Sequence, residues 1–455
     1  MLFSKHHIAI AVFCMAANVH AADLMSAWQA AQNRDPELAA ARTLLEQAAF
    51  RKDQAAALWE PRAVATVQAG TGFFDNSTKG AQAMGQSDVS FNTNANVGVM
   101  TRAGVSAHKP WLSPEREAQS KQLALSDDIA QAQWQQVEQA LMLRTAQKYV
   151  DVLSEEITLG VLQRQHKTLQ QAAKEISKRQ SIGDASAMDV QEASARVSDM
   201  HAQVLSQENR LAMKRVAYQQ LVGQDPTQLA TLPPNIQVTP SKLGDVNQWV
   251  QRAKEHSPSL NMLRLQQAIQ GQEAKRIQAG NATTLDWVAQ AQLDRLMGHG
   301  MYGTMSNQAS QVMVGVQMQT PLGKNSGLAA REGEALKQVE KLRFDEEAAF
   351  LQIEQGVRDA WQNIATAAQR MAALEQSLKA SQARLAATRN AHRTGARTTN
   401  EWLGAEHDAA QAELALQQLR LQTVMERLRL QAASGTLDAS VLQSINALLK
   451  NAVAR

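Results

Sequence analysis

The placement of proline limits the fold of this 455-residue chain more than any other feature of its sequence. All 10 prolines lie in the first 321 residues, and the tracts 115–225 and 322–455 contain none. Proline costs about 3 kcal/mol inside a helix, so proline-free tracts rich in Ala, Gln, Leu, Glu and Arg predict long helices. Ser113 is a favourable N-cap with proline directly after it, and we therefore expect one helix to run from there to Ser181.

Apolar residues within these tracts are spaced alternately three and four positions apart. Leu159 and Leu162 belong to one such row, and Trp402, Ala405 and Ala409 belong to a row late in the chain. This spacing is typical of coiled-coil seams, although an ordinary helical bundle core explains each row about as well. The expected helix lengths favour a layered tube of helices about 100 Å long.

Four glycines indicate that the chain contains two tandem structural repeats. Gly183 and Gly395 are 212 residues apart, and so are Gly223 and Gly435. Gly183 and Gly395 each interrupt a helical tract, which predicts a reversal of the chain, because glycine tolerates the left-handed backbone of a tight turn. The expected division is a leader over 1–21, a first repeat over 22–230, a linker or equatorial segment over 231–256, a second repeat over 257–435, and a C-terminal tail over 436–455.

Between the helical tracts, the sequence alternates between apolar or small residues and polar residues, which predicts β-strands with two different faces. The expected strands cover 62–73, 88–108, 284–297 and 310–320. Such strands suit either a sheet on a soluble core or a membrane barrel with a wet interior. Four strands are too few to close a barrel, and open sheet edges cannot lie in lipid. A barrel would therefore have to be shared among several copies of the chain.

Residues 1–21 have the pattern of a secretory signal peptide, with Lys5 near the start, an apolar stretch, and small residues before a cleavage site after Ala21. The alternative is a buried N-terminal helix. Cys14, the one cysteine of the chain, lies in this segment, so we expect no disulfide, cysteine-based metal site or thiol nucleophile after processing. The net charge of +3 gives no indication of nucleic-acid binding.

In their order along the chain, these features resemble the TolC family of outer-membrane channel-tunnel proteins, also called outer membrane factors. The matching segments are Asp35-Pro36-Glu37-Leu38 near the start and two hairpin turns, Ile182-Gly183 with Met188-Asp189 and Thr394-Gly395-Ala396-Arg397-Thr398. The resemblance covers residues 22–440. It implies an α+β membrane protein in which a long coiled-coil α-helical barrel is joined to four strands per chain in a trimeric 12-stranded β-barrel.

The resemblance also implies a function in transport, without a catalysed reaction. Members of the family are passive exit ducts of tripartite export systems, which serve type I protein secretion, multidrug efflux or both. It implies a homotrimer in the outer membrane whose helical tunnel crosses the periplasm. The implied partners are a periplasmic adaptor (membrane fusion) protein, an inner-membrane ABC or proton-driven transporter, and outer-membrane lipid. It implies no nucleic acid, cofactor, metal or catalytic residue.

The resemblance assigns candidate residues to the ends of the two helical hairpins. The residues that match the family's periplasmic gate are Asp189, His392, Arg397 and Glu401. We expect Asp189 to face Arg397 across helices or chains, and three copies of Glu401 to form an acidic ring that attracts cations. The turn residues that would contact the adaptor are Ile182, Gly183, Asp184, Thr394, Gly395 and Ala396.

The sequence departs from the family pattern at two places near the gate. Gly404 stands where a second acidic residue is common, and His392 stands in place of an aromatic residue. For each charged gate residue, the alternative is an ordinary charge on a solvated helix.

Two other classes of function stay open on the sequence. A soluble periplasmic coiled-coil scaffold would have the same helical rows without a shared barrel. A secreted enzyme would need a convergent polar cleft, and the chain has no HExxH, GxSxG, P-loop or GxGxxG motif. Glu406-His407-Asp408 could suggest a metal site, but its place on a charged helix favours an exposed face.

Overall fold

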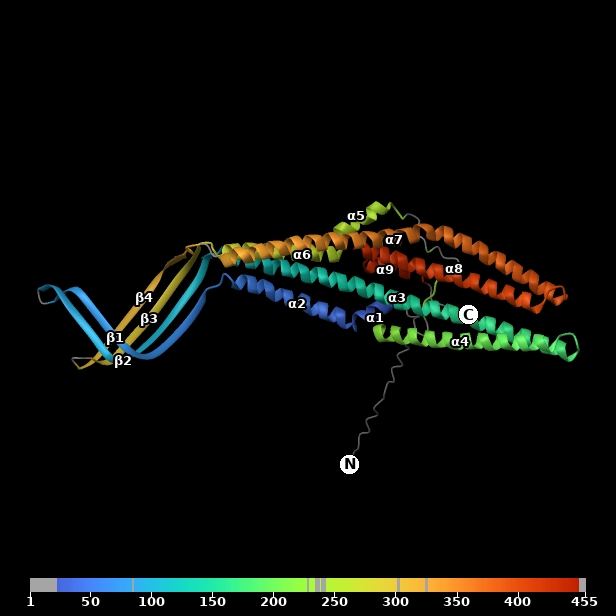
Figure 1. The fold of residues 1–455 in the computed structure, drawn as a ribbon, viewed down its shortest axis with the longest axis horizontal. Helices are drawn as coiled ribbons and strands as arrows, with labels where there is room; N and C mark the ends of the chain where they lie inside the picture. Colours follow the sequence, from blue (N-terminus) through green and yellow to red (C-terminus); the bar gives the residue numbers. More distant parts are fainter. Residues whose placement is uncertain are drawn as a thin grey trace, which may run out of the picture. The chain divides into compact units, whose positions relative to one another are not determined.

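A computed structural model describes residues 23–449 except for 84–85, 227–228, 234–237, 239–242, 301–302 and 324–325. Figure 1 draws and labels its helices and strands along the chain. The expected signal peptide with Cys14 lies outside the described residues, as do parts of the expected linker and the end of the expected tail.

Most of the described chain is helical, and the prolines of the helical regions begin helices instead of interrupting them. The long helices are α2 (Pro36–Ala57), α3 (Pro114–Ser181), α4 (Ala187–Val222), α6 (Pro258–Ala279), α7 (Ser326–Arg393) and α8 (Thr399–Ala433). Asp35 caps α2, because its Oδ1 accepts a hydrogen bond from the Leu38 amide at 2.9 Å. The helix expected to end at Ser181 ends there.

Short helices account for the remaining helical segments: α1 (Leu24–Gln32), α5 (Val246–His256) and α9 (Ala439–Asn446). α9 lies in the segment expected to be a tail, and it is anchored to the start of α1. Asn446 Nδ2 donates to Asp23 Oδ2 at 2.8 Å, and Asn446 Oδ1 accepts from the Leu24 amide at 3.0 Å. Ile445 is buried in the same apolar core as Leu24.

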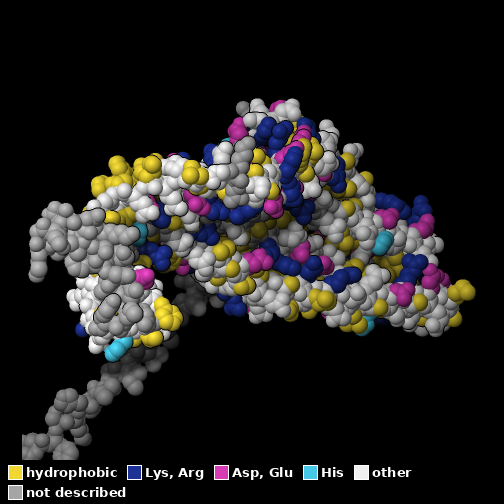
Figure 2. Space-filling view, turned by 60° about the vertical axis from the view of Figure 1, so that its left-hand side comes forward, with side chains coloured by type: hydrophobic (Ala, Val, Ile, Leu, Met, Phe, Trp, Pro, Cys, Tyr) yellow, Lys and Arg dark blue, Asp and Glu magenta, His cyan; other side chains and the backbone are white. Residues whose placement is uncertain are grey.

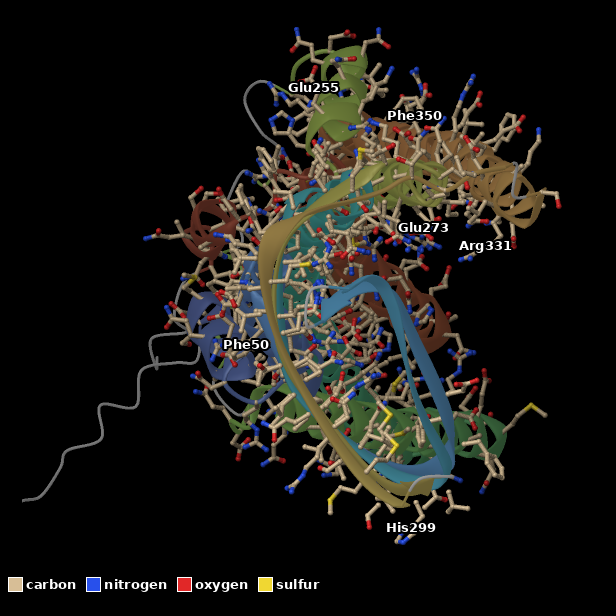
Figure 3. The ribbon with its side chains drawn as sticks, turned by 90° about the vertical axis from the view of Figure 1, so that its left-hand side faces the viewer. Phe50, Glu255, Glu273, His299, Arg331 and Phe350 are labelled. Atoms are coloured by element: carbon tan, nitrogen blue, oxygen red, sulfur yellow. The ribbon has the colours of Figure 1, made fainter. Side chains whose placement is uncertain are left out.

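The described strands form one antiparallel sheet in the order β1-β2-β3-β4. They are β1 (Arg62–Ala83), β2 (Gln86–Leu112), β3 (Thr284–Gly300) and β4 (Gly303–Gln319). β1 extends well beyond the expected 62–73, because its backbone pairing with β2 continues where the alternation of residue types has ended, whereas β2 exceeds the expected 88–108 by only a few residues at each end. Seen in Figure 3, the strands follow a curved path.

The register aligns the alternating patterns of neighbouring strands, so the sheet has two distinct faces. Val105 of β2 lies opposite Ala291 of β3, which lies opposite Val312 of β4. On the other face, Arg102 Nε contacts Asp294 Oδ1 at 2.6 Å. We call the first side the apolar face; its large exposed members include Val67, Val97, Val99, Val105, Trp287, Leu293, Met297, Val312, Val314, Val316 and Met318.

The chain divides into two compact units. The helical unit contains Met1–Ala41, Trp134–Pro258 and Ala349–Arg455, and the sheet unit contains Arg42–Gln133 and Ser259–Ala348. Each unit draws on both halves of the sequence, so the units are not the two expected repeats. The repeats themselves stay a prediction.

Two tyrosines lie at the centre of the core of the helical unit. Tyr149 of α3 and Tyr218 of α4 are fully buried, with ring centroids 6.3 Å apart. Burial raises the pKa of both phenols, so both are neutral. The Tyr149 hydroxyl donates to the Ala230 carbonyl at 2.8 Å, whereas the buried Tyr218 hydroxyl has no hydrogen-bond partner among the described residues.

An ionic network joins α6 to α3 within the sheet unit. Glu273 accepts from Arg276 at 2.7 Å and from Gln122 at 2.9 Å, and Arg276 also contacts Glu115 at 3.0 Å. The hydrogen bond from Arg276 lowers the pKa of Glu273 to about 2, helped by the charge of Arg331, which lies near Glu273 in Figure 3. The network thus joins the two helices by the Arg276–Glu115 ion pair and by the hydrogen bond from Gln122 to Glu273.

Basic and acidic side chains are interspersed over the helical surface drawn in Figure 2. Several of them form pairs one helical turn apart, such as Lys341 with Asp345 at 2.7 Å and Arg358 with Glu354 at 2.7 Å. Exposed pairs of this kind contribute only a few tenths of a kcal/mol each. Within the described ranges, every helix falls short of the length and apolar character needed to cross a membrane.

The tyrosine pair gives a test of the helical core. Tyr149→Phe should destabilise the protein by about 1 kcal/mol, because the Ala230 carbonyl loses its buried donor. Tyr218→Phe is the matched control and should leave stability unchanged or slightly increased, since it removes a desolvated hydroxyl. Thermal unfolding in detergent measures both effects. Equal melting temperatures for the two variants would contradict this account.

Candidate functional site at the hairpin tips

The two helical hairpins of the helical unit end in turns of the same construction. We call the segments 179–189, between α3 and α4, and 391–401, between α7 and α8, the first and the second tip. Gly183 has φ 83° and Gly395 has φ 76°, both in the left-handed region. No described atom lies within 4 Å of a Cβ built at either glycine. The backbone conformation of the turn, and not a lack of space, therefore requires glycine at these positions.

Each tip also starts its second helix with a capping box. At the first tip, Ser186 Oγ accepts from the Asp189 amide at 3.1 Å, and the Ser186 amide donates to Asp189 Oδ2 at 3.0 Å. At the second tip, Thr398 Oγ1 accepts from the Glu401 amide at 3.3 Å, and the Thr398 amide donates to Glu401 Oε2 at 2.9 Å. Two candidate gate carboxylates thus hold helix starts in place.

The caps determine the electrostatics of both carboxylates. Hydrogen bonds from the backbone and hydroxyl of Ser186 hold the pKa of Asp189 below its ordinary value. The backbone amide of Thr398, followed by Arg397, has the same effect on the pKa of Glu401. Both side chains are therefore negatively charged at neutral pH, and both are exposed.

The arginines of the two tips bind different partners. Arg179 Nε donates to Asp184 Oδ2 at 2.8 Å, which ties the first turn to the end of α3. Arg397 pairs with Glu401 one helical turn away. An acidic ring made from copies of Glu401 would thus also contain Arg397, which reduces its negative charge.

The two tips lie side by side and share a cavity of about 400 Å³. Asn400 Nδ2 of the second hairpin donates to Glu192 Oε1 of the first at 3.0 Å. The cavity is lined by both tips, including Arg179, Asp184, Asp189, Glu192, Gly395, Ala396, Arg397, Asn400 and Glu401. Asp189 and Arg397 thus line one cavity, although their hydrogen bonds run to Ser186 and Glu401. The expectation that Asp189 faces Arg397 across helices or chains stays a prediction.

His392 lies apart from the charged residues. It is buried against Trp402, with ring centroids 5.2 Å apart and planes at 27°, and its Nε2 is 3.0 Å from Thr399 Oγ1. This stack closes the end of α7 onto α8. Ile182, Gly183 and Thr394, by contrast, are exposed at the outer side of the turns.

Sequence reasoning missed three residues of this site. Trp402 appeared there only as a member of an apolar row, yet it supports His392. Asn400 and Glu192 connect the hairpins, and nothing in their spacing of 208 residues indicates the contact. The 212-residue offset between the glycines was the available signal that the two tips are equivalent, although it does not predict that they touch.

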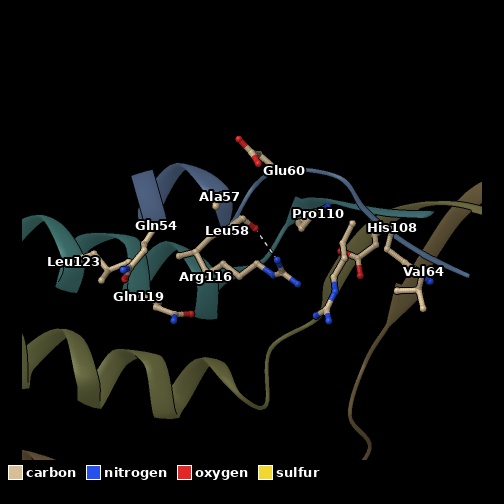
Figure 4. A pocket seen from close by; sticks show the side chains of 12 residues that line it. Gln54, Ala57, Leu58, Glu60, Val64, His108, Pro110, Arg116, Gln119 and Leu123 are labelled. Atoms are coloured by element: carbon tan, nitrogen blue, oxygen red, sulfur yellow. Dashed lines mark hydrogen bonds between the residues drawn. The ribbon is translucent and has the colours of Figure 1, made fainter. Parts of the chain in front are cut away.

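A second cavity, of about 740 Å³, lies in the sheet unit where the strands join α2 and α3 (Figure 4). Arg116 Nη1 crosses the junction and donates to the Leu58 carbonyl at 2.6 Å, the dashed line in the figure. Arg62 and Asp286 bring charges of opposite sign to the wall, and His108 lines it as well. This mixture indicates a polar junction without a preference for one charge.

No group of three or more His, Cys, Asp or Glu side chains that could hold a metal ion occurs in the described part of the chain. Asp408, from the Glu406-His407-Asp408 run, contacts Arg384 at 2.8 Å. This ion pair agrees with an exposed helix face.

Comparison with known proteins relates this architecture to outer-membrane channels. A family model described as "Outer membrane efflux protein" matches residues 249–436. "Outer membrane protein TolC" of Vibrio cholerae is 22% identical over 321 residues, which are 70% of this chain and 73% of the relative. "Proteases secretion protein PrtF" of Dickeya chrysanthemi is 24% identical over 321 residues, 69% of this chain and 68% of the relative.

The fold is also found among solved structures. The crystal structure of the outer membrane protein VceC from Vibrio cholerae matches with a TM-score of 0.72 at 16% identity, covering 90% of this chain and 96% of that one. The expected long helices with a four-stranded sheet therefore agree with a known outer-membrane fold.

Acidification should destabilise the capped helix starts at the two tips. The folded-state pKa values of Asp189 and Glu401 lie below their ordinary values of 3.8 and 4.5. The capping hydrogen bonds of these carboxylates therefore stabilise the helix starts fully when the pH is above the ordinary values. This stabilisation is lost as the pH falls through the lowered pKa values. Hydrogen-exchange protection of the Glu401 and Trp402 amides, corrected for intrinsic rates, should fall on acidification. Glu401→Gln keeps an oxygen for the cap without titrating, so protection at the second tip should no longer depend on pH. Unchanged protection of the native chain at low pH would contradict this assignment.

Proposed function

Because the chain belongs to the TolC family of outer-membrane channel proteins, we propose that it is the exit duct of a tripartite export system. It is an outer-membrane protein, and in the proposed duct solutes move passively while an inner-membrane transporter supplies the energy. The observation that carries the proposal is the sheet of the sheet unit. Its apolar face is exposed in the single chain, and its other face is polar.

The edges of the sheet support a trimer. β1 and β4 each have one side without a strand partner in the described residues. Such edges are not tolerated in lipid, where every backbone N–H and C=O needs a partner. Three copies, each pairing its β4 with β1 of the next, would make a closed barrel of 12 strands, within the range known for outer-membrane barrels. The polar face would then line the water-filled interior.

The hairpin tips are the proposed gate. Asp189, Arg397 and Glu401 line one cavity and carry charge there, while the His392–Trp402 stack braces the second tip. Repacking of these tips around the threefold axis would change the width of the periplasmic opening. The paired Arg397 and Glu401 make this opening mixed in charge instead of purely acidic.

The outer turns are the proposed contact with a periplasmic adaptor. Ile182 is 78% exposed, and Gly183, Asp184, Thr394, Gly395 and Ala396 are exposed around it or at the equivalent turn. The names of the relatives refer to TolC and to secretion of proteases, which supports protein secretion, efflux or both as the process served. A soluble scaffold is less well supported, because an exposed apolar sheet face is unfavourable in water.

The proposal predicts a trimeric membrane channel. The protein should fractionate with the outer membrane, migrate as three copies in detergent, and conduct ions when reconstituted in planar bilayers. Val314→Asp places a charge on the apolar face and should abolish membrane assembly. Gln317→Asp, on the polar face of the same strand, is the control and should assemble normally. Recovery of the native chain from the soluble periplasm would contradict the proposal.

The gate assignment predicts a change in conductance. Arg397→Ser and Asp189→Ala should each raise the single-channel conductance of the trimer, because they release contacts that hold the tips. Arg384→Ser is the matched control: it breaks an exposed 2.8 Å pair with Asp408 in the same hairpin and should leave conductance unchanged. Conductance equal to the native value in both tip variants would remove these residues from the gate.

A further inference from the structure

A pair of tryptophans marks the helix-joined end of the apolar face. Trp111, at the end of β2, and Trp287, near the start of β3, stack with ring centroids 5.7 Å apart and planes at 24°. They are 59% and 48% exposed, so both indoles are accessible at the surface of the sheet. Tryptophan concentrates at the boundary between lipid and water, because one part of its ring system is apolar and the other carries an N–H donor.

A cation lies next to this pair. Lys109 is directly opposite Trp287 in the β2–β3 register, and its side chain is exposed. Lysine beside tryptophan at the end of an apolar surface is the arrangement expected where a lipid headgroup begins, because the ammonium group meets phosphate and the indoles meet the upper acyl chains.

A second cation occurs further along the same face. Arg295 of β3 lies opposite Thr101 of β2 and Gln308 of β4, so three polar residues form one row across the apolar face. The neighbouring carboxylate, Asp294, points to the polar face and pairs with Arg102 at 2.6 Å. Arg295 is exposed, and no ion pair to its guanidinium is found among the described residues.

The distance between the tryptophan pair and the Arg295 row is close to the height of the apolar band of an outer-membrane barrel. Arg295 is eight residues beyond Trp287 on β3, which corresponds to about 26 Å along the strand and about 20 Å across a membrane for a strand tilted by about 40°. The extended arginine side chain adds several Å. The apolar band of outer-membrane barrels is about 25 Å tall. Between the tryptophan pair and the Arg295 row, the face carries Ala289, Ala291 and Leu293, and their register partners are apolar except for Ser310.

We infer that the hydrocarbon layer covers the apolar face between the Trp111–Trp287 pair and the Thr101–Arg295–Gln308 row, and that Lys109 and Arg295 bind lipid phosphate groups at its two surfaces. This inference rests on the proposed membrane function and adds the boundaries and the ligand chemistry. The part of β3 beyond Arg295, including His299 (Figure 3), then lies on the aqueous side of the outer boundary.

Spin labels on β3 test the boundaries. Ala291→Cys, His299→Cys and Gln290→Cys, each in a Cys14→Ser chain, are labelled with a nitroxide and reconstituted into phosphatidylcholine vesicles containing phosphatidylglycerol. The label at residue 291 should be accessible to oxygen and protected from a water-soluble nickel complex. The labels at 299 and at 290, which is on the polar face, should show the opposite preference. If 291 and 299 both report lipid, the boundary at Arg295 is wrong while the membrane function stands. If 291 behaves like 290, the proposed function itself fails.

Bound lipid tests the phosphate contact. Native mass spectrometry of the trimer should detect phosphatidylglycerol that remains bound, and Arg295→Gln should reduce its occupancy several-fold. Arg295→Lys keeps the charge and should retain most of the lipid. Arg102→Gln removes a cation from the polar face of the same region and should have no effect. Loss of lipid in Arg102→Gln but not in Arg295→Gln, or equal occupancy in all variants, would overturn the assignment.

Discussion

The need of the strand backbone for hydrogen-bond partners is the main constraint on this structure. Each long strand presents N–H and C=O groups that need partners. Among the described residues, one chain pairs them only between β1 and β2, β2 and β3, and β3 and β4. The outer sides of β1 and β4 are left to be paired, while one face of the sheet is apolar and exposed. In lipid these two conditions are met together only when the edges of several copies join.

The helical hairpins meet the same demand locally. At each tip, a left-handed glycine and a Ser or Thr capping box provide partners for the backbone groups that a helix end leaves free. This solution uses Asp189 and Glu401, so carboxylates that look like free charges in the sequence are also structural groups. A gate built on them couples any movement of the opening to the starts of α4 and α8.

Features that depend on local chemistry could be read from the sequence. Pro114 and Ser113 begin α3, and Gly183 lies in the hairpin turn after it, because proline, N-caps and glycine act within a few residues. The end of β1 over 74–83 was missed, since it is held by pairing with β2 and not by an alternating pattern. α9 was missed for a similar reason: its anchor is Asp23, 423 residues away.

The sequence by itself determined the long helices, the turns between them and the two-faced character of the strands, because each follows from residue type and short-range spacing. The candidate gate residues rest instead on the resemblance to the family. Only the tertiary structure decided which rows of the four strands share a face and that Asn400 reaches Glu192. These relations depend on strand register and helix packing, which bring together residues that no sequence period connects.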